Sequence, residues 1–259
     1  MTITYRIGAV TDTGHVRTQN QDRYLIRSTH LGRNPAALLV VADGMGGLER
    51  GEVASEMTIE GLENWWNAYV SGIISADQYS VTLDDAIYEI HRKIYYYAQE
   101  HGMSTGSTLS ALFLRGARYC YKQIGDSRIY LHDRKGNHQI TRDQNVLNRE
   151  VDAGHEIGNL DPRRGRALVN ALGPTTELNI STASGSVKPG MAFLLCSDGF
   201  YGELGDAAME DPNNWGNSNK PQEELDALLQ RILSGPAGDN ATAVLCRVSW
   251  AGLFSRDVQ

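Results

Sequence analysis

Hydrophobic positions change their spacing several times along the chain, and each spacing predicts a kind of element. Short apolar runs predict three strands, near residues 3–10, 24–27 and 37–42. Apolar residues then recur at helical spacing over residues 52–66, and a second helix is predicted behind Thr82 as its N-cap. The N-terminal part of the chain is therefore expected to form three strands followed by two helices.

From residue 106 the spacing returns to that of strands. The predicted strands cover residues 107–114, 117–124, 128–132, 180–187, 192–196 and 241–248. Helices are predicted over residues 143–154 and from Pro221, which suits the first turn of a helix. Residues 155–174 are polar, irregular and glycine-bearing, and are predicted to form a mobile flap.

The order of these elements indicates the fold class. Helices come as a pair, then strands, then a helix, then strands, which is not the strict alternation of a doubly wound parallel sheet. The order favours an α+β layered sandwich of antiparallel sheets. Because the sequence shows no repeat or linker, residues 1–259 are predicted to form a single domain, with the flap at about 155–174 and a C-terminal tail at 249–259.

The composition is that of an ordinary soluble globular protein, with 41% hydrophobic and 21% charged residues. The net charge of −7, without a basic stripe, argues against nucleic-acid binding. No apolar window is long enough to span a bilayer and no signal peptide is apparent, so we expect no membrane association and a cytoplasmic location. Cys120, Cys196 and Cys246 lie in strand-like runs and are predicted to be buried thiols, not disulfides or zinc ligands.

Aspartates recur beside small residues at the ends of predicted strands. The pattern appears at Asp43-Gly44, Gly125-Asp126, Asp198-Gly199 and Asp239-Asn240. A single Asp-Gly pair usually does no more than shape a turn. Strand ends that gather on one rim of a sandwich would instead bring these carboxylates together, and the recurrence favours this second interpretation.

Carboxylates that share a site repel each other, and their pKa values rise unless a cation neutralises them. Ligation by oxygen alone selects hard ions such as Mg²⁺ or Mn²⁺ over zinc. The histidines are scattered, and no His-x-x-x-His or Cys-x-x-Cys spacing occurs. The glycines of residues 44–47 do not match a dinucleotide-binding or P-loop pattern. The pattern therefore predicts a site for Mn²⁺ or Mg²⁺.

The chain resembles the metal-dependent serine/threonine protein phosphatases of type 2C, particularly the stand-alone bacterial members. The matching stretches lie in the family's order over residues 12–248, and they are 12–22, 41–47 with Gly51-Glu52, 106–108, 125–128, 140–143, 195–199 and 238–243. This resemblance implies a four-layer α-β-β-α sandwich of two antiparallel sheets, with two metal ions in the cleft between them and a weaker third ion. It implies that Asp43 bridges two ions and that the Gly44 carbonyl is a ligand of one of them. It further implies that Asp198 and Asp239 are ligands of the other ion, and that Asp126 with Asp198 holds the third. By the same resemblance, Asp22 supports the site through water and Arg17 binds the substrate phosphate.

The function that the resemblance implies is hydrolysis of phosphoserine and phosphothreonine in proteins, by direct attack of a metal-bridging hydroxide. The expected partners are phosphorylated proteins, including a Ser/Thr kinase or its targets, whose signalling the protein would reverse as a monomer. No side-chain nucleophile is needed, and Ser197 has no histidine base next to it. The alternatives are a regulatory module that binds phosphoproteins with little turnover, and a metal-dependent hydrolase of small phosphoesters.

The sequence departs from the family pattern at several places. Gln21 stands where many relatives have Glu, and Ser107 replaces a common Thr. Gln144 follows Asp143 where His is usual. Met45 stands where eukaryotic relatives place a His thought to protonate the leaving group, which leaves the general acid unassigned. His155 in the predicted flap is a candidate for that role, against the alternative of a solvated loop residue.

Overall fold

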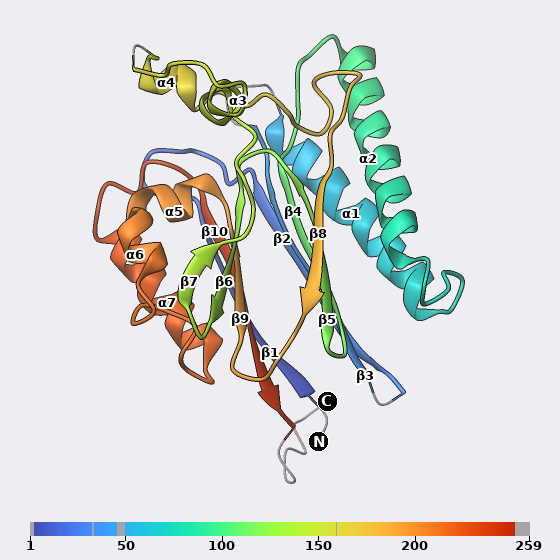
Figure 1. The fold of residues 1–259 in the computed structure, drawn as a ribbon. Coiled ribbons are helices and arrows are strands. Elements are labelled where there is room, and N and C mark those ends of the chain that lie inside the picture. The colour runs from blue at the N-terminus through green and yellow to red at the C-terminus, as the bar shows by residue number, and fades with distance from the viewer. Residues whose placement is uncertain (1–2, 33, 46–49, 159, 252–259) are drawn as a thin grey trace.

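Two antiparallel sheets lie face to face in the computed structural model, with helices on both outer faces (Figure 1). The structure describes residues 3–32, 34–45, 50–158 and 160–251. In these ranges the first sheet has the order β1-β10-β9-β6-β7 and the second sheet the order β2-β3-β4-β5-β8. The predicted four-layer α-β-β-α sandwich is confirmed.

The strands are β1 (Ile3–Asp12), β2 (Asp22–Leu31), β3 (Asn34–Asp43), β4 (Leu109–Arg115), β5 (Arg118–Ile124), β6 (Arg128–Asp133), β7 (Gly136–Gln139), β8 (Ser181–Ser186), β9 (Ala192–Cys196) and β10 (Ala241–Trp250). The helices are α1 (Gly51–Val70), α2 (Tyr79–His101), α3 (Val146–Asp152), α4 (Pro162–Gly165), α5 (Asp198–Leu204), α6 (Asp206–Glu210) and α7 (Pro221–Leu233).

The uninterrupted apolar run of β3 follows from burial on both of its faces. Leu39 and Val41 belong to the core between the two sheets. Leu38 and Val40, which alternate with them, pack in the core beneath α1 and α2. A third core lies between the other sheet and α5, α6 and α7, and its largest fully buried side chain is that of Trp215. The strands that lead to the predicted aspartates are therefore held by apolar packing from both sides.

Several element boundaries differ from the sequence prediction. The helix predicted behind Thr82 begins at Tyr79 and has Gln78 as its N-cap. The Thr82 hydroxyl does not cap the helix but donates to the carbonyl of Gln78 and accepts from the indole of Trp65. The helix predicted over 143–154 is shorter, because the Asn145 side chain caps it and α3 starts one residue later. Strand β7 and helices α4, α5 and α6 were not predicted, since each is too short to show a clear period.

The remaining predictions concern the flap, the tail and the cysteines. Within residues 155–174, which we call the flap, Asp161 caps the short helix α4. Most of the predicted tail, from residue 252 on, and Gly46 and Gly47 lie outside the described residues. The three cysteines are free and buried, as predicted. None of the helices in the described ranges combines the length and apolar character that a bilayer crossing requires.

A buried lysine fastens α2 to the second sheet. The Lys122 side chain on β5 is 1% exposed, and its ammonium lies 2.7 Å from the carboxylate of Asp84 on α2. It also donates to Ser80 and Thr182 at 3.2 Å each. Removing Asp84 alone would leave a buried charge with weaker partners, which is the costly way to break such a pair.

We expect Asp84→Ala to lower the free energy of unfolding by about 3 kcal/mol, the lower end of the range for a broken buried pair because Asp84 is itself partly exposed. Urea unfolding followed by circular dichroism measures this change. The double variant Lys122→Met/Asp84→Ala is the control, and it should recover most of the loss. Equal losses in the single and double variants would contradict this account.

Candidate metal centre

The strand ends bring five aspartates from both sheets to one end of the sandwich, and these five residues form what we call the acidic rim. Asp22 opens β2 and is the register partner of Asp43, which closes β3. Asp126 lies in the turn between β5 and β6, Asp198 follows β9 and opens α5, and Asp239 precedes β10. The predicted gathering of strand ends is therefore observed, although Asp198-Gly199 forms the first turn of a helix where only a turn was expected.

Two glycines allow the loops of this rim to approach each other closely. A Cβ atom on Gly44 would lie 2.3 Å from the carbonyl oxygen of Gly51 and 2.7 Å from that of Gln21. A Cβ atom on Gly199 would lie 2.2 Å from the carbonyl oxygen of Asn240. Because real Cβ atoms do not come so near, only glycine fits at these two positions.

Desolvation and mutual repulsion dominate the electrostatics of the rim. Burial, and then the charges of Asp22 and Asp198, raise the pKa of Asp43 well above its usual range. Burial, followed by Asp239, raises the pKa of Asp198. Burial raises the pKa of Asp126 to about 7, with a further contribution from Asp198. A nearby cation would offset the repulsion between the carboxylates and so lower these pKa values.

Asp22 is the most deeply buried of the five, at 3% exposure. The Ser197 hydroxyl donates to its carboxylate at 2.7 Å and in turn accepts from the backbone N–H of Thr242 at 3.0 Å. Burial raises the pKa of Asp22 to about 6, although hydrogen bonds from Ser197 and Thr242 oppose the rise. The Ser197–Asp22 hydrogen bond links the two sheets. Ser197 is therefore a hydrogen-bond donor within the rim, in keeping with its lack of a histidine base.

Arg17 lies beside the rim on the loop between β1 and β2. Its guanidinium donates to the Asp239 carboxylate at 2.7 Å, and this hydrogen bond raises the pKa of Arg17. Asn240 holds the same loop: its side chain accepts from the Gln21 N–H at 2.8 Å and donates to the carbonyls of Thr13 and Gln19. Sequence reasoning missed Ser197 and Asn240, although both stand directly beside a predicted aspartate.

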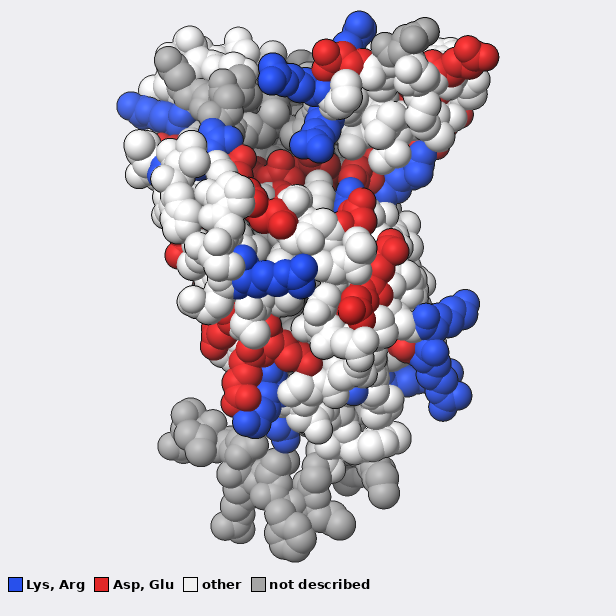
Figure 2. All heavy atoms as spheres, turned by 90° about the vertical axis from the view of Figure 1, so that its left-hand side faces the viewer, with Lys and Arg blue, Asp and Glu red and all other residues white. Residues whose placement is uncertain are grey.

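A cavity of about 800 Å³, which we call the acidic cavity, opens between the rim and the flap. Asp126, Asp198 and Asp239 line one part of it, and Arg142 and Arg166 line the part near the flap. Figure 2 shows acidic side chains gathered in a hollow of this face, with basic side chains above them. The cavity therefore offers carboxylate ligands for a cation and basic groups for an anion.

The donor set fits hard divalent cations, since it consists of carboxylates and the backbone carbonyl that Gly44 can present. As the side chains lie, no three His, Cys, Asp or Glu residues of the described ranges converge closely enough to hold one ion. The Asp239 carboxylate is hydrogen-bonded to Arg17 instead. Ligation by Asp239 would therefore require its carboxylate to be shared with, or released by, Arg17.

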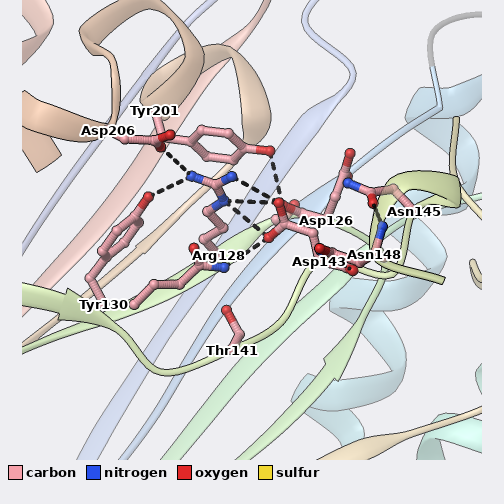
Figure 3. A network of polar contacts seen from close by, with 12 residues as sticks. Asp126, Arg128, Tyr130, Thr141, Asp143, Asn145, Asn148, Tyr201 and Asp206 are labelled. Carbon is pink, nitrogen blue, oxygen red and sulfur yellow. Dashed lines mark hydrogen bonds and ion pairs between the residues drawn. The ribbon is translucent and has the colours of Figure 1, made fainter. Parts of the chain in front are cut away.

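An arginine whose side chain is 14% exposed joins the rim to the segment that precedes α3 (Figure 3). Arg128 of β6 donates to Asp143 over 3.0 Å from Nε and 2.8 Å from Nη2, and its guanidinium lies 3.7 Å from the ring centre of Tyr201. Burial by itself would lower the pKa of Arg128, but the hydrogen bonds to Asp143 raise it. The Tyr201 hydroxyl donates to the carbonyl of Asp126 at 3.2 Å. Asp126 is thus connected to the segment that leads into α3.

The positions that depart from the family pattern have identifiable surroundings. The Gln21 amide donates to the carboxylate of Glu52 at 3.1 Å. The backbone N–H of Met45 donates to the carbonyl of Gly106 at 3.0 Å. His155 pairs with Glu150 at 2.7 Å and is not among the described residues that line the acidic cavity. Its role as a general acid remains a prediction without support from this geometry.

The chain and its fold have counterparts among known proteins. The serine/threonine phosphatase stp of Listeria innocua is 29% identical over 91% of this chain and 92% of its own length. A crystal structure of the catalytic domain of the serine/threonine protein phosphatase PstP with two manganese ions matches with a TM-score of 0.75 and 29% identity, over 96% of this chain and all of that one. PppA of Pseudomonas aeruginosa, described as a regulatory component of a type VI secretion system, matches with a TM-score of 0.74 and 28% identity, over 94% of this chain and 97% of that one.

The fold, the acidic rim and these matches together place the chain in the class of serine/threonine protein phosphatases. The family model for protein phosphatase 2C matches residues 13–234, which is most of the chain. The chain belongs to the protein phosphatase 2C family. The resemblance inferred from the ordered motifs is therefore confirmed at the level of the family.

The raised pKa values predict how the metal-free protein responds to pH. Asp22, at about 6, and Asp126, at about 7, bind protons more tightly when folded than when unfolded, where a carboxyl has its usual pKa near 3.9. Because the folded state then holds more protons, its stability falls as pH rises from about 4 to about 7.

We expect Asp126→Asn to be stabilised relative to the natural protein as pH rises through this window, since the amide has no charge to bury. Melting temperatures measured in EDTA at several pH values between 4 and 8 test this expectation. A constant difference between the two proteins at every pH would show that Asp126 does not titrate abnormally.

Proposed function

We propose that the protein is a phosphoprotein phosphatase that uses two divalent cations, Mn²⁺ or Mg²⁺, to hydrolyse phosphoserine and phosphothreonine, and that a weaker third ion binds near Asp126. The observation that supports this most is the gathering of five aspartates from both sheets at one rim, where their repulsion calls for cations. The two manganese ions in the related PstP structure support the same stoichiometry.

The site residues divide into ligands and a phosphate-binding group. Asp43 and the Gly44 carbonyl lie at the end of β3 in the second sheet, whereas Asp198 and Asp239 adjoin β9 and β10 of the first sheet, so ions held by both groups would lie between the sheets. Asp22, fixed by Ser197, suits a supporting role through water. Bound ions supply a water of lowered pKa as the nucleophile and offset the charge of the phosphoryl group.

Arg17 is suited to bind the substrate phosphate. Its side chain is 41% exposed, so the guanidinium is open to an incoming anion while Asp239 orients it. A planar guanidinium makes paired, charge-assisted hydrogen bonds with phosphate oxygens. Arg17 would therefore hold the phosphoryl group beside the cations and share its developing negative charge.

The partners we propose are phosphorylated proteins of the same cell, including a Ser/Thr kinase or its targets, with the protein acting as a cytoplasmic monomer and a single domain. The second candidate function, a regulatory module that binds phosphoproteins with little turnover, would be favoured by lost metal aspartates. All five aspartates are present, and this supports turnover.

We expect Asp43→Ala to lower kcat at least about 100-fold, because its carboxylate is the one proposed to contact both ions and stabilisation of transition-state charge depends on them. Hydrolysis of a phosphothreonine peptide in saturating Mn²⁺, with EDTA as a reference, measures the change. The regulatory-module hypothesis predicts instead that the natural protein binds the peptide without metal-stimulated turnover. Activity that survives complete chelation would contradict the metal mechanism.

We expect Arg17→Ala to lower kcat/KM for the same peptide about 10- to 100-fold, which corresponds to the usual value of hydrogen bonds to a charged group. The Mn²⁺ concentration for half-maximal activity should not rise, since the exposed Arg17–Asp239 pair contributes little by itself. Arg17→Lys is the control and should recover only part of the activity, because an ammonium lacks the planar fork. A loss that appears only as weaker Mn²⁺ binding would show that Arg17 acts on Asp239 and not on phosphate.

A further inference from the structure

Gln144 is one of the positions at which this chain departs from the family pattern, and its surroundings are unusually rich in hydrogen bonds. It lies in the segment between β7 and α3, which precedes the flap in the chain. Gln144 lines a cavity of about 790 Å³ beside the flap, and it is not among the described residues that line the acidic cavity. Any influence on the rim must therefore act through other residues.

The first set of contacts holds the turn that contains Asp126. The Gly125 N–H donates to Oε1 of Gln144 at 2.7 Å, and the Gly125 carbonyl accepts from the Gln144 N–H at 3.0 Å. On its other side Gly125 packs against Thr108, where a Cβ atom would lie 2.7 Å from the Thr108 side chain. Gly125 also has a φ of +89°, a conformation that other residues rarely adopt. The turn is therefore confined between Thr108 and Gln144.

The Thr108 hydroxyl extends this contact to the second sheet. It accepts from the backbone N–H of Asp43 at 3.0 Å and lies 2.7 Å from the hydroxyl of Ser127. Tyr201 adds a hydrogen bond to the carbonyl of Asp126 (Figure 3). Each of these groups fixes a backbone atom next to a predicted metal ligand, and Gln144 is the one that also contacts the flap.

The second set of contacts joins Gln144 to the segment that leaves the flap. Its carbonyl accepts from the N–H of Val169 at 3.0 Å, and Oε1 accepts from the side-chain amide of Asn170 at 2.6 Å. Its Nε2 donates to the Ser181 hydroxyl at 3.0 Å, at the start of β8. Gln144 thus connects the C-terminal part of the flap and the start of β8 with the Asp126 turn.

We propose that Gln144 is a positioning residue that holds the Gly125-Asp126 turn in place for cation binding and couples this turn to the C-terminal part of the flap. The inference depends on the proposed function only in so far as Asp126 is a ligand. Outer hydrogen-bond partners of ligands typically change metal affinity 10- to 100-fold when they are removed.

Gln144→Met keeps the length of the side chain and removes the hydrogen bonds from its end. We expect the Mn²⁺ concentration for half-maximal hydrolysis of p-nitrophenyl phosphate to rise about tenfold or more. We also expect the Gly125 amide proton, followed by NMR in the metal-free protein, to exchange faster with solvent than in the natural protein. The second measurement requires neither metal nor catalysis.

Two variants serve as controls. Ser181→Ala removes a partner of Nε2 but leaves the Gly125 contact, so its Mn²⁺ dependence and Gly125 exchange should match those of the natural protein. Gln144→His introduces the residue that is usual in the family, whose ring nitrogen can accept from the Gly125 N–H. It should restore the Mn²⁺ dependence to within about threefold of the natural value.

A Gln144→Met protein with an unchanged melting temperature, Mn²⁺ dependence and Gly125 exchange would overturn the proposal. An equal effect of Ser181→Ala would also overturn it, since the contact with β8 would then be the important one. Rapid exchange of the Gly125 amide in the natural protein overturns it without any variant. If the natural protein shows no Mn²⁺-stimulated hydrolysis, the proposed function fails, and the Gly125 exchange measurements alone then decide the positioning role.

Discussion

Repulsion between closely spaced carboxylates is the constraint on which the rest of this structure depends. Five aspartates converge from two sheets, and burial together with neighbouring charge raises the pKa of Asp22, Asp43, Asp126 and Asp198. Such an arrangement is unfavourable by itself, so it has to be supported by the remainder of the fold. The apolar cores on both faces of β3 supply that support, because they fix the strands whose ends hold the charges.

Short polar side chains then set the positions of the charges relative to each other. Ser197 of the first sheet donates to Asp22 of the second, and Asn240 accepts from Gln21 across the same gap. A serine or asparagine side chain has few rotatable bonds, and a hydrogen bond to it therefore fixes the spacing of the two backbones closely. Glycine at position 44 is needed for the same reason, since any side chain there would push the strand ends apart.

The flap and the segment that precedes it are connected to this rim by polar contacts. Helix α3, which precedes the flap, contributes no buried residue, so apolar packing does little to hold it. Its attachment comes from the Arg128–Asp143 pair, which is shielded from water, and from the hydrogen bonds of Gln144. A shielded, hydrogen-bonded pair keeps a defined geometry better than an exposed one. The flap and the proposed metal ligands are therefore parts of one polar network, in which the departure from His to Gln at position 144 retains an acceptor for the Gly125 N–H.

The sequence by itself determined the strands, the long helices and the set of aspartates. Apolar periodicity reports which faces of an element are covered, and the repeated Asp beside a small residue marked the ends of strands. It did not reveal α4, α5, α6 or β7, which are too short to show a period. It placed the start of α2 at Thr82 because a cap and an internal hydroxyl look alike in sequence. The Arg17–Asp239 pair and the roles of Ser197, Asn240 and Gln144 were decided only by the tertiary structure. These contacts join residues that are far apart in the chain, and sheet packing, not local sequence, brings them within hydrogen-bonding distance.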